Sequence, residues 1–500
     1  MNKRNIGIIL SYLNTGLSLV CGLILSSYLL RMLGSTEYGV YQMISSFANY
    51  LVLLEFGTGS VMTRNIVAVR VRNESNEEIS KNYSTIIIIS VVLSFIILIV
   101  SVVFYFMIGT IYSESLTTEQ VSYGKQIFIF ITVYLIVSFF SQTMNGLALA
   151  YEDYCVIPIV SIARIVIRTI LLIVLILFAR YSIIIAIVDA VLGFVIGVFM
   201  FAYCRIKFKI KFKIKYFDSK ILKASFPLCF AIFLQTIVNQ ANNNVDKFVI
   251  GIKLNPESVS LYSVALYIYS VFSSLTTIPI SMYAPQIIQI VNSGKKDNEM
   301  LDTLVAPSRM IVIVGGVCLF GFIACGKSFI SIVYGNEYLD AWLIAIIIMA
   351  PMFINMSNGV LINVLDAMDK RMFRSLTLTL TTIGNIILTV FWIDWMGMVG
   401  AAFATAISVC LGQITLMNIY YSKKIGINVL KMYRLTFKGI LIYHMMGAAL
   451  GFVSTYFIDN AYITLFVSGG TYMVIFFLGY LLFGMTDQER KRFKKIFKRV

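Results

Sequence analysis

The sequence predicts an all-α integral membrane protein, and three observations support this prediction. Hydrophobic residues make up 59% of the 500 residues and charged residues only 13%, with a mean hydropathy of +0.88. Apolar runs long enough to cross ~30 Å of hydrocarbon recur along the chain, and the segments between them are too short for a large soluble domain. Lys and Arg residues gather in alternate loops. Because a helix satisfies its own backbone N–H and C=O groups within one crossing segment, the apolar runs should be helices.

The first apolar run sets the start of the membrane domain. It follows the charged opening "MNKR", is too long for the apolar part of a cleaved signal peptide and lacks an A-x-A site, so we interpret it as an uncleaved first span. Further runs of suitable length and apolar character follow it. The fourteen predicted helices are 6–30, 40–62, 83–107, 127–148, 155–178, 183–203, 226–250, 261–290, 310–333, 342–365, 376–393, 400–420, 439–457 and 462–483.

The distribution of positive charge predicts the topology. If the N-terminus is cytoplasmic, 32 of the 40 Lys and Arg residues fall on the cytoplasmic side. This asymmetry predicts that both termini are cytoplasmic and that the number of spans is even. The net charge of +16 would be compatible with nucleic-acid binding in a soluble protein, but here the charges follow the loops, so no nucleic-acid partner is expected.

A weak internal repeat divides the chain. Sliding the sequence on itself by 221 residues aligns Leu33 with Leu254 and Tyr41 with Tyr262, and it superposes polar positions of the first and seventh helices. Two six-helix bundles with equivalent first helices are typical of transporters built by duplication. We therefore predict an N-terminal six-helix bundle (1–210), a C-terminal six-helix bundle (211–425), and two extra helices with a basic cytoplasmic tail (426–500).

The seventh helix carries a polar stripe. Gln235, Asn239, Asn242 and Asp246 recur at i, i+4, i+7 and i+11, which is one face of an α-helix. Amides and a carboxylate are costly against lipid, so this face is predicted to border a water-filled cavity. The first helix has a milder stripe that includes Asn14, for which helix–helix packing through small polar residues is the alternative.

Two arginines stand near the middle of the fifth predicted helix. Arg164 and Arg168 are one turn apart and share a face, and each costs ~2.5–3.5 kcal/mol at the centre of a bilayer. They need water, a counter-charge or an anionic ligand, and the candidate counter-charges are Glu55, Asp189 and Asp246. One interpretation is a structural ion pair. The other is a cationic site whose guanidinium groups bind phosphate oxygens.

The loop "RIKFKIKFKIKYF" (205–217) alternates basic and apolar residues with a period of two, so it is not predicted to be an amphipathic helix. It is either a topogenic linker between the two halves or an extended ribbon lying on anionic headgroups.

Five segments, spread over about the first 425 residues, are specific in combination. They are "LLRMLGSTEYGVYQ" (29–42), "LLEFGTGSVMTR" (53–64), "NNNVDKFVIG" (242–251), "VYGNEYLDAW" (333–342) and "GMVGAAFATAIS" (397–408). In these segments the chain resembles the bacterial polysaccharide repeat-unit flippases of the MOP exporter superfamily, relatives of the MATE drug antiporters and the lipid II flippases. The Gly-Ala-Ala pattern of the family is clear around Gly400 and eroded in the first half, near Ile183.

The resemblance implies a MATE/MOP-like fold around a cationic central cavity that works by alternating access. It implies that undecaprenyl-pyrophosphate-linked oligosaccharides cross the bacterial cytoplasmic membrane for capsule, O-antigen or exopolysaccharide synthesis, with a polysaccharide polymerase and glycosyltransferases as partners. No cofactor is expected beyond Na⁺ or H⁺ as a coupling ion. The site residues that follow are Arg164 and Arg168 for the pyrophosphate, the amides Gln142, Asn145, Gln235, Asn239 and Asn242 for the substrate, and Glu55 and Asp246 for the coupling ion.

Two other function classes compete. A drug or cation antiporter on the same fold would need a carboxylate-lined cavity, which Arg164 and Arg168 oppose. A membrane polysaccharide polymerase or ligase would need a large outer loop with acid and base groups, whereas the outer loops are short and the only histidine, His444, is predicted to be a packing residue. Seven cysteines without CxxC spacing predict no metal site, and no GxxxxGK[ST] motif for ATP occurs. The chain is therefore not expected to be an enzyme.

Overall fold

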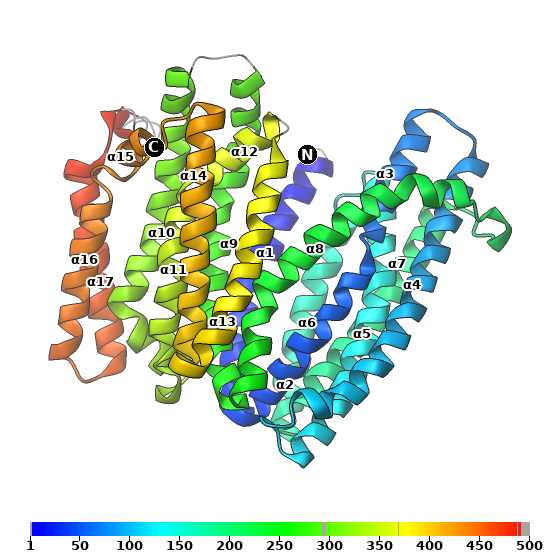
Figure 1. Ribbon diagram of the computed structural model, residues 1–500, viewed down its shortest axis with the longest axis horizontal. Coiled ribbons are helices and arrows are strands. Elements are labelled where there is room, and N and C mark those ends of the chain that lie inside the picture. The colour runs from blue at the N-terminus through cyan, green and yellow to red at the C-terminus, as the bar shows by residue number, and fades with distance from the viewer. Residues whose placement is uncertain (1–2, 293–296, 369, 488, 492–500) are drawn as a thin grey trace. The chain divides into compact units, whose positions relative to one another are not determined.

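The computed structural model describes residues 3–292, 297–368, 370–487 and 489–491, and this part of the chain is helical and contains no strand (Figure 1). The predicted all-α membrane fold is confirmed. The predicted basic C-terminal tail lies, beyond Lys491, outside the described residues.

The chain forms two compact units, Met1–Ser260 and Leu261–Val500. The predicted boundaries near residues 210 and 425 stay predictions. The helices of unit 1 are α1 (Lys3–Leu33), α2 (Ser35–Ala48), α3 (Thr58–Val71), α4 (Asn76–Ile111), α5 (Thr118–Ala150), α6 (Val156–Phe178), α7 (Ile183–Phe208) and α8 (Ser219–Lys253). Helix α9 (Pro256–Asn292) leads into unit 2, which continues with α10 (Asp297–Val333), α11 (Ala341–Ser357), α12 (Gly359–Ala367), α13 (Arg371–Ser408), α14 (Met417–Tyr420), α15 (Val429–Phe437), α16 (Leu441–Ser454) and α17 (Ala461–Gly479).

The predicted count of fourteen helices agrees with the structure once its breaks are considered. In the described part of the chain, ten helices are long and apolar enough to cross a membrane, or up to twelve if the bent pairs α11–α12 and α15–α16 are each one span. One of the ten is a 55-residue stretch, Arg371–Ile425, which turns back at Gly397. The broken segment α2–α3 corresponds to the second predicted helix. All fourteen predicted ranges lie on helical segments to within two residues at their ends.

The second predicted helix is not continuous. After α2 the chain forms a 3₁₀ segment, η1 (Asn49–Glu55), and Phe56 and Gly57 then adopt left-handed backbone conformations with φ of 51° and 64°. A Cβ on Gly57 would lie 2.5 Å from the side chain of Ile232 on α8. Glycine is therefore required here both by its φ and by the close approach of α8.

The turn within α13 also depends on glycine. Gly397 has φ 58° and ψ −139°, a conformation that is accessible essentially only to glycine. Three residues later, a Cβ on Gly400 would lie 2.4 Å from the carbonyl oxygen of Trp392. The eleventh and twelfth predicted helices are thus the two arms of one tight hairpin (Figure 1).

Unit 1 is organised around α5, which packs against α2, α3, α4 and α7, while α1 packs against α6. Hydroxyl groups connect three of these helices. Thr143 of α5 lies 2.9 Å from the Thr58 hydroxyl of α3 and 2.8 Å from the Ser90 hydroxyl of α4. Each polar group is thereby satisfied inside an apolar bundle, which fixes the relative register of the helices.

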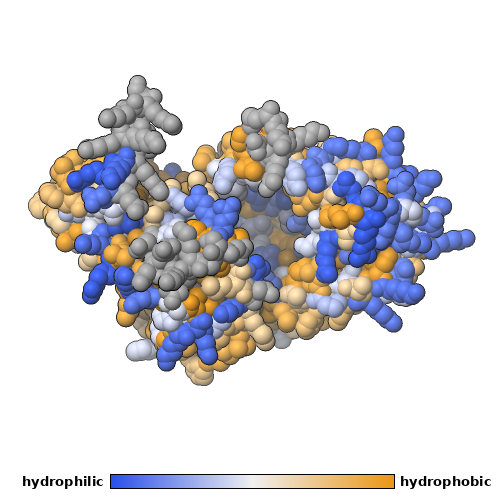
Figure 2. Space-filling view, turned by 90° about the horizontal axis from the view of Figure 1, so that it is seen from above, coloured by the Kyte–Doolittle hydropathy of each residue, from blue (hydrophilic) through white to orange (hydrophobic). Residues whose placement is uncertain are grey.

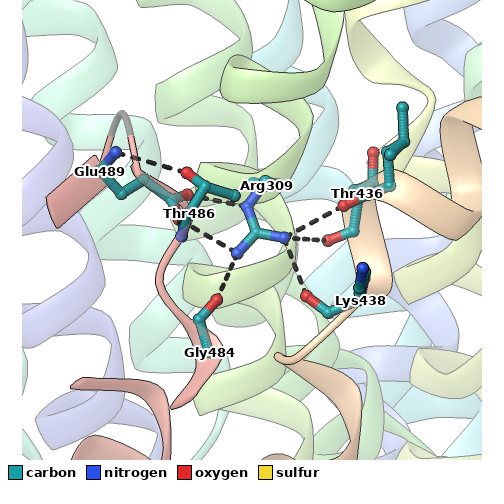
Figure 3. A network of polar contacts seen from close by, with 7 residues as sticks. Arg309, Thr436, Lys438, Gly484, Thr486 and Glu489 are labelled. Carbon is teal, nitrogen blue, oxygen red and sulfur yellow. Dashed lines mark hydrogen bonds and ion pairs between the residues drawn. The ribbon is translucent and has the colours of Figure 1, made fainter. Parts of the chain in front are cut away.

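Unit 2 is organised around α10, and a single arginine fixes the ends of its last helices (Figure 3). Arg309 is 2% exposed and donates to both carboxylate oxygens of Glu489, at 2.8 and 3.1 Å. It also donates to the carbonyl oxygens of Lys438 and Gly484, at 2.9 and 2.8 Å. The guanidinium therefore joins α10 to both chain segments that flank the α16–α17 pair.

The basic loop 205–217 begins as part of α7. Helix α7 continues to Phe208 and ends at Lys209, which has φ 52°. The prediction that this segment is not an amphipathic helix therefore holds only after Phe208, because the hydrogen-bond ladder of α7 continues through the first four residues of the segment. Residues 209–213 have no regular structure, and Ile214–Tyr216 form a single 3₁₀ turn, η2.

Candidate functional site

The two mid-span arginines face α7. Arg168 Nε lies 2.6 Å from Asp189 Oδ1, and its Nη2 lies 2.9 Å from Asp189 Oδ2. Arg164 Nη2 lies 3.8 Å from the same Oδ1. The arginine side chains are 30% and 29% exposed and that of Asp189 is 13% exposed. Of the three carboxylates predicted as counter-charges, the structure therefore brings Asp189 to the pair.

The cluster of Arg164, Arg168 and Asp189 keeps an excess positive charge. Arg168 occupies both oxygens of Asp189 in a bidentate pair, the strongest geometry available to these groups. Arg164 has only a longer contact with this carboxylate, and its guanidinium lies 5.0 Å from the ring centroid of Tyr134 on α5. Its Nε is buried and has no hydrogen-bond partner among the described residues. Two cations share one anion, so the site retains a donor-rich guanidinium.

The cluster lies at mid-depth in the span. Helix α6 is 23 residues long, ~35 Å, with Arg164 ~12 Å from its start and Arg168 ~15 Å from its end. Neither arginine is close enough to a helix end for its head group to reach water easily along the lipid surface. The arrangement is therefore suited to a charged ligand or to water at this depth.

Helix α1 runs beside α6 in the same direction. Gly7 packs against Tyr154, and the Tyr28 hydroxyl donates to the carbonyl oxygen of Ile173 at 2.8 Å. These two contacts place Asn14 about one helical turn before the level of Arg164 and Ser18 level with it. Asn14 Oδ1 is buried and, within the described residues, accepts no hydrogen bond. The mild polar stripe of the first helix thus lies at the depth of the arginines.

The amides predicted on α5 lie elsewhere. Asn145 Nδ2 donates to Gln142 Oε1 at 3.1 Å; Gln142 is exposed and Asn145 is half-buried. Gln142 is eight residues beyond Tyr134, or ~12 Å along α5. The amide pair is thus separated along the helix from the level at which Tyr134 meets Arg164.

The predicted stripe on α8 is present as one helix face. Gln235 Nε2 donates to Asn239 Oδ1 at 3.3 Å, and Asn242 is exposed like them, whereas Asp246 is 7% exposed. On this face the amide side chains are therefore exposed and the carboxylate is buried. The Gln235 amide is bonded to Asn239 on its own helix and not to Arg164 or Arg168.

Glu55, at the end of η1, and Asp246, on α8, lie at different heights along the axis of α8. Phe56, which follows Glu55, stacks on Phe233 with ring centroids 4.7 Å apart, whereas Tyr50 meets Phe248 at 5.5 Å. Phe233 and Phe248 are fifteen residues apart, ~22 Å along the helix. The two carboxylates therefore do not form one ion site. In the described part of the chain, no group of three or more His, Cys, Asp or Glu side chains is arranged to hold a metal.

Sequence reasoning missed Tyr134 and left Asp189 outside the predicted site. Asp189 carried a signal, because an aspartate within an apolar run needs a partner. Tyr134 carried none, since its contact with Arg164 depends on how α5 and α6 are placed. His444 is fully buried, stacks on Phe476 at 3.9 Å and lies 2.8 Å from the Tyr472 hydroxyl, which agrees with the predicted packing role.

The fold of the chain is similar to that of solved transporters of the MATE/MOP-like type. It aligns with a structure of the lipid II flippase MurJ in an inward closed conformation, with a TM-score of 0.73 and 17% identity over 95% of this chain and 98% of that one. It also aligns with an inward-facing multidrug resistance MATE family transporter of the MOP superfamily, with a TM-score of 0.60 and 13% identity over 84% of this chain and 95% of that one.

The chain belongs to the polysaccharide biosynthesis protein family, whose model matches residues 4–291. It is also 25% identical over 174 residues to the probable low-salt glycan biosynthesis flippase Agl15 of Haloferax volcanii. That match covers 34% of this chain and 36% of Agl15, so the chain spans about a third of the length of this curated relative. The family resemblance stated from the sequence motifs is confirmed.

Proposed function

We propose that this protein is a flippase that moves undecaprenyl-pyrophosphate-linked oligosaccharide repeat units across the bacterial cytoplasmic membrane by alternating access. It acts as a transporter and not as a catalyst. Both termini lie on the cytoplasmic side in this proposal, in keeping with the charge asymmetry of the loops. Membership of the polysaccharide biosynthesis protein family and the printed name of Agl15 support a substrate built from lipid-linked sugars.

The observation that carries the proposal is the uneven charge of the arginine cluster. Asp189 is engaged by both oxygens with Arg168, and Arg164 keeps donors that Asp189 does not satisfy. Pyrophosphate supplies anionic oxygens that match a guanidinium fork, and it is the charged group of the substrate that must cross the bilayer. A cationic drug would meet a net positive charge at this depth, which disfavours the antiporter alternative.

Five amides that are exposed or half-buried supply the second part of the proposed site. Gln142 and Asn145 on α5, together with Gln235, Asn239 and Asn242 on α8, present donors and acceptors that suit sugar hydroxyls. In this substrate the sugars are linked to the pyrophosphate. A distance between the arginines and the amides therefore fits a substrate that carries its charged group at one end. The polymerase and the glycosyltransferases act on the product and the precursor of this transport step.

The test is a comparison of three arginine variants in a strain that lacks the chromosomal copy of the gene. Arg164→Gln and Arg168→Gln are each expected to lower the rate of surface polysaccharide appearance about tenfold or more, which corresponds to the loss of one charge-assisted contact. The matched control is Arg180→Gln, an exposed arginine just beyond α6. The amount of each variant in the membrane is measured by immunoblot, and the rates are normalised to it.

Dye efflux is measured in the same cells. Loss of efflux with intact polysaccharide display in the Arg164→Gln and Arg168→Gln variants would replace the flippase by the antiporter. Normal polysaccharide display in all three variants would remove the arginine cluster from the mechanism.

A further inference from the structure

A large apolar groove opens on the surface of unit 1. It has a volume of about 440 Å³ and is lined by α4, α5 and α7, with Phe95 and Leu98 on α4, Val137 and Phe140 on α5, and Val198 on α7. This volume lies within the range of sites that hold small ligands. Leu98 and Val198 are exposed although they are apolar, so the groove has no protein cover in the described part of the chain.

The groove accepts only hydrocarbon. Its one polar side chain, Ser94, donates its hydroxyl to the carbonyl oxygen of Ser90 at 2.9 Å and is already satisfied. Helices α4, α5 and α7 are all candidate membrane spans. The medium expected against the groove is therefore the interior of the bilayer, where a lipid chain is the occupant of matching chemistry.

The basic loop lies next to one end of the groove. The backbone N–H of Lys213 donates to Ser84 Oγ at 3.1 Å, and that of Asp218 donates to Thr85 Oγ1 at 3.0 Å. Ser84 precedes Val91, the first groove residue of α4, by seven residues, ~10 Å. The loop is thus fixed across α4 at a short distance from the groove.

Helix α7 makes the same connection on the other side. Phe194, Val198 and Phe201 line the groove, and Arg205 follows on the same helix face, one turn beyond Phe201. Arg205 is exposed, at the point where α7 gives way to the loop. The apolar lining of the groove and the exposed cations of residues 205–215 therefore form one continuous surface, which we call the strip.

Most cations of this strip have no protein counter-charge in the part of the chain that the structure describes. Lys207 pairs with Asp153, and Glu78 on α4 pairs with Lys81. Among the described residues, none of Arg205, Lys209, Lys211, Lys213 and Lys215 forms an ion pair. Their side chains are exposed, and hydrophobic side chains stand among the hydrophilic ones at this end of unit 1, as the right side of Figure 2 shows. Exposed Ile206, Phe212 and Ile214 alternate with the cations.

We propose that this strip is a binding site for an anionic phospholipid of the bilayer, with one acyl chain in the α4–α5–α7 groove and the phosphate headgroup on the cations of the 205–215 segment. Lysines with interleaved apolar residues are suited to the boundary between headgroups and acyl chains. The site does not depend on the proposed transport function. It gives the basic loop a specific ligand in place of a general attraction to the membrane.

The headgroup half is tested on the purified full-length protein by native mass spectrometry with phosphatidylglycerol and phosphatidylcholine as probes. The wild type is expected to retain more phosphatidylglycerol. Lys211→Gln, Lys213→Gln and Lys215→Gln combined should weaken retention of this lipid by roughly fivefold per lysine removed, and abolish the preference. The matched control is the exposed triplet Lys423→Gln, Lys424→Gln and Lys431→Gln in unit 2, which changes net charge equally and should behave as the wild type.

The chain half is tested by filling the groove. Val198→Trp, at a position 52% exposed, should lower retention of both lipids several-fold, whereas Val474→Trp, at a position 57% exposed on α17, should have no effect. If the Val198→Trp protein does not elute as a monodisperse species, Leu98→Gln places an amide in the groove without added bulk and takes its place.

Three results would overturn the proposal. The first is an unchanged phosphatidylglycerol preference after removal of the three loop lysines, or an equal loss in the unit 2 control. The second is unchanged lipid retention in the groove variants. The third is displacement of phosphatidylglycerol by an equimolar polyprenyl phosphate, which would reassign the groove to a lipid-linked substrate.

Discussion

Arg168 donates to both carboxylate oxygens of Asp189, at 2.6 and 2.9 Å, while Arg164, one turn earlier on the same helix, reaches this carboxylate only at 3.8 Å. The two arginines are therefore not equivalent. Arg168 completes a neutral bidentate pair between α6 and α7, and Arg164 supplies the excess charge. This asymmetry leads to a stability prediction that is separate from transport.

Asp189→Asn is expected to destabilise the protein, because it leaves two guanidinium groups within one helical turn without an anion. Loss of one partner from a fully buried pair costs ~3–5 kcal/mol, and partial exposure of this pair reduces the expected loss to about 1–3 kcal/mol. Thermal unfolding of the detergent-solubilised protein measures the change. The single variant Arg164→Gln should unfold near the wild-type temperature, since the Arg168–Asp189 pair remains.

A double variant sharpens this prediction. Arg164→Gln added to Asp189→Asn removes one of the two unbalanced cations and should recover part of the lost stability. Equal stability of Asp189→Asn and the wild type would show that water screens the cluster fully.

Gly57→Ala is expected to destabilise the bend between η1 and α3. Gly57 has φ 64°, and a Cβ there would collide with the side chain of Ile232 on α8, for a combined cost of about 1–3 kcal/mol. The control is Gly16→Ala on α1, where a Cβ meets no atom within 4 Å. A fluorescence-based thermal shift compares the two. A Gly57→Ala protein as stable as the Gly16→Ala protein would contradict the conformation assigned to this bend.

The Arg309–Glu489 pair predicts an acid-sensitive step in unit 2. Burial by itself raises the pKa of Glu489, but hydrogen bonds from Arg309 and from the Thr486 backbone outweigh it, and the net pKa is lowered. A carboxyl group with a lowered pKa in the folded state stabilises fully above its ordinary pKa of ~4.3, and this contribution is lost as pH falls through the lowered value. The stability difference between the wild type and Glu489→Gln should be largest at neutral pH and should shrink at pH values below the ordinary pKa.

Thermal unfolding across an acidic pH series measures this difference. Asp487→Asn, which removes an exposed carboxylate two residues away, is the control and should show no such convergence. A Glu489→Gln deficit that stays constant down to the most acidic pH at which the protein remains folded would refute the linkage.

Glu55→Gln and Asp246→Asn test ion coupling separately, because the two residues occupy distant levels of α8. Asp246 is buried and within reach of an electrostatic interaction with Tyr50, so its neutralisation is expected to alter the pH or Na⁺ dependence of transport. Transport by reconstituted protein under imposed H⁺ or Na⁺ gradients provides the measurement. Unchanged gradient dependence in both variants would remove carboxylate coupling at these positions.

The helices could be predicted from the amino-acid sequence, since hydropathy and length are local properties and the bilayer requires each crossing segment to satisfy its own backbone. The sequence also singled out Arg164 and Arg168 as costly residues that need partners. Which partner each arginine has depends on how the helices pack. Asp189 follows Arg168 by 21 residues, and only the packing of α6 on α7 gives it to Arg168 and not to Arg164. The break at Gly57 has the same origin, because the close approach of α8, far along the chain, fixes where the second span bends.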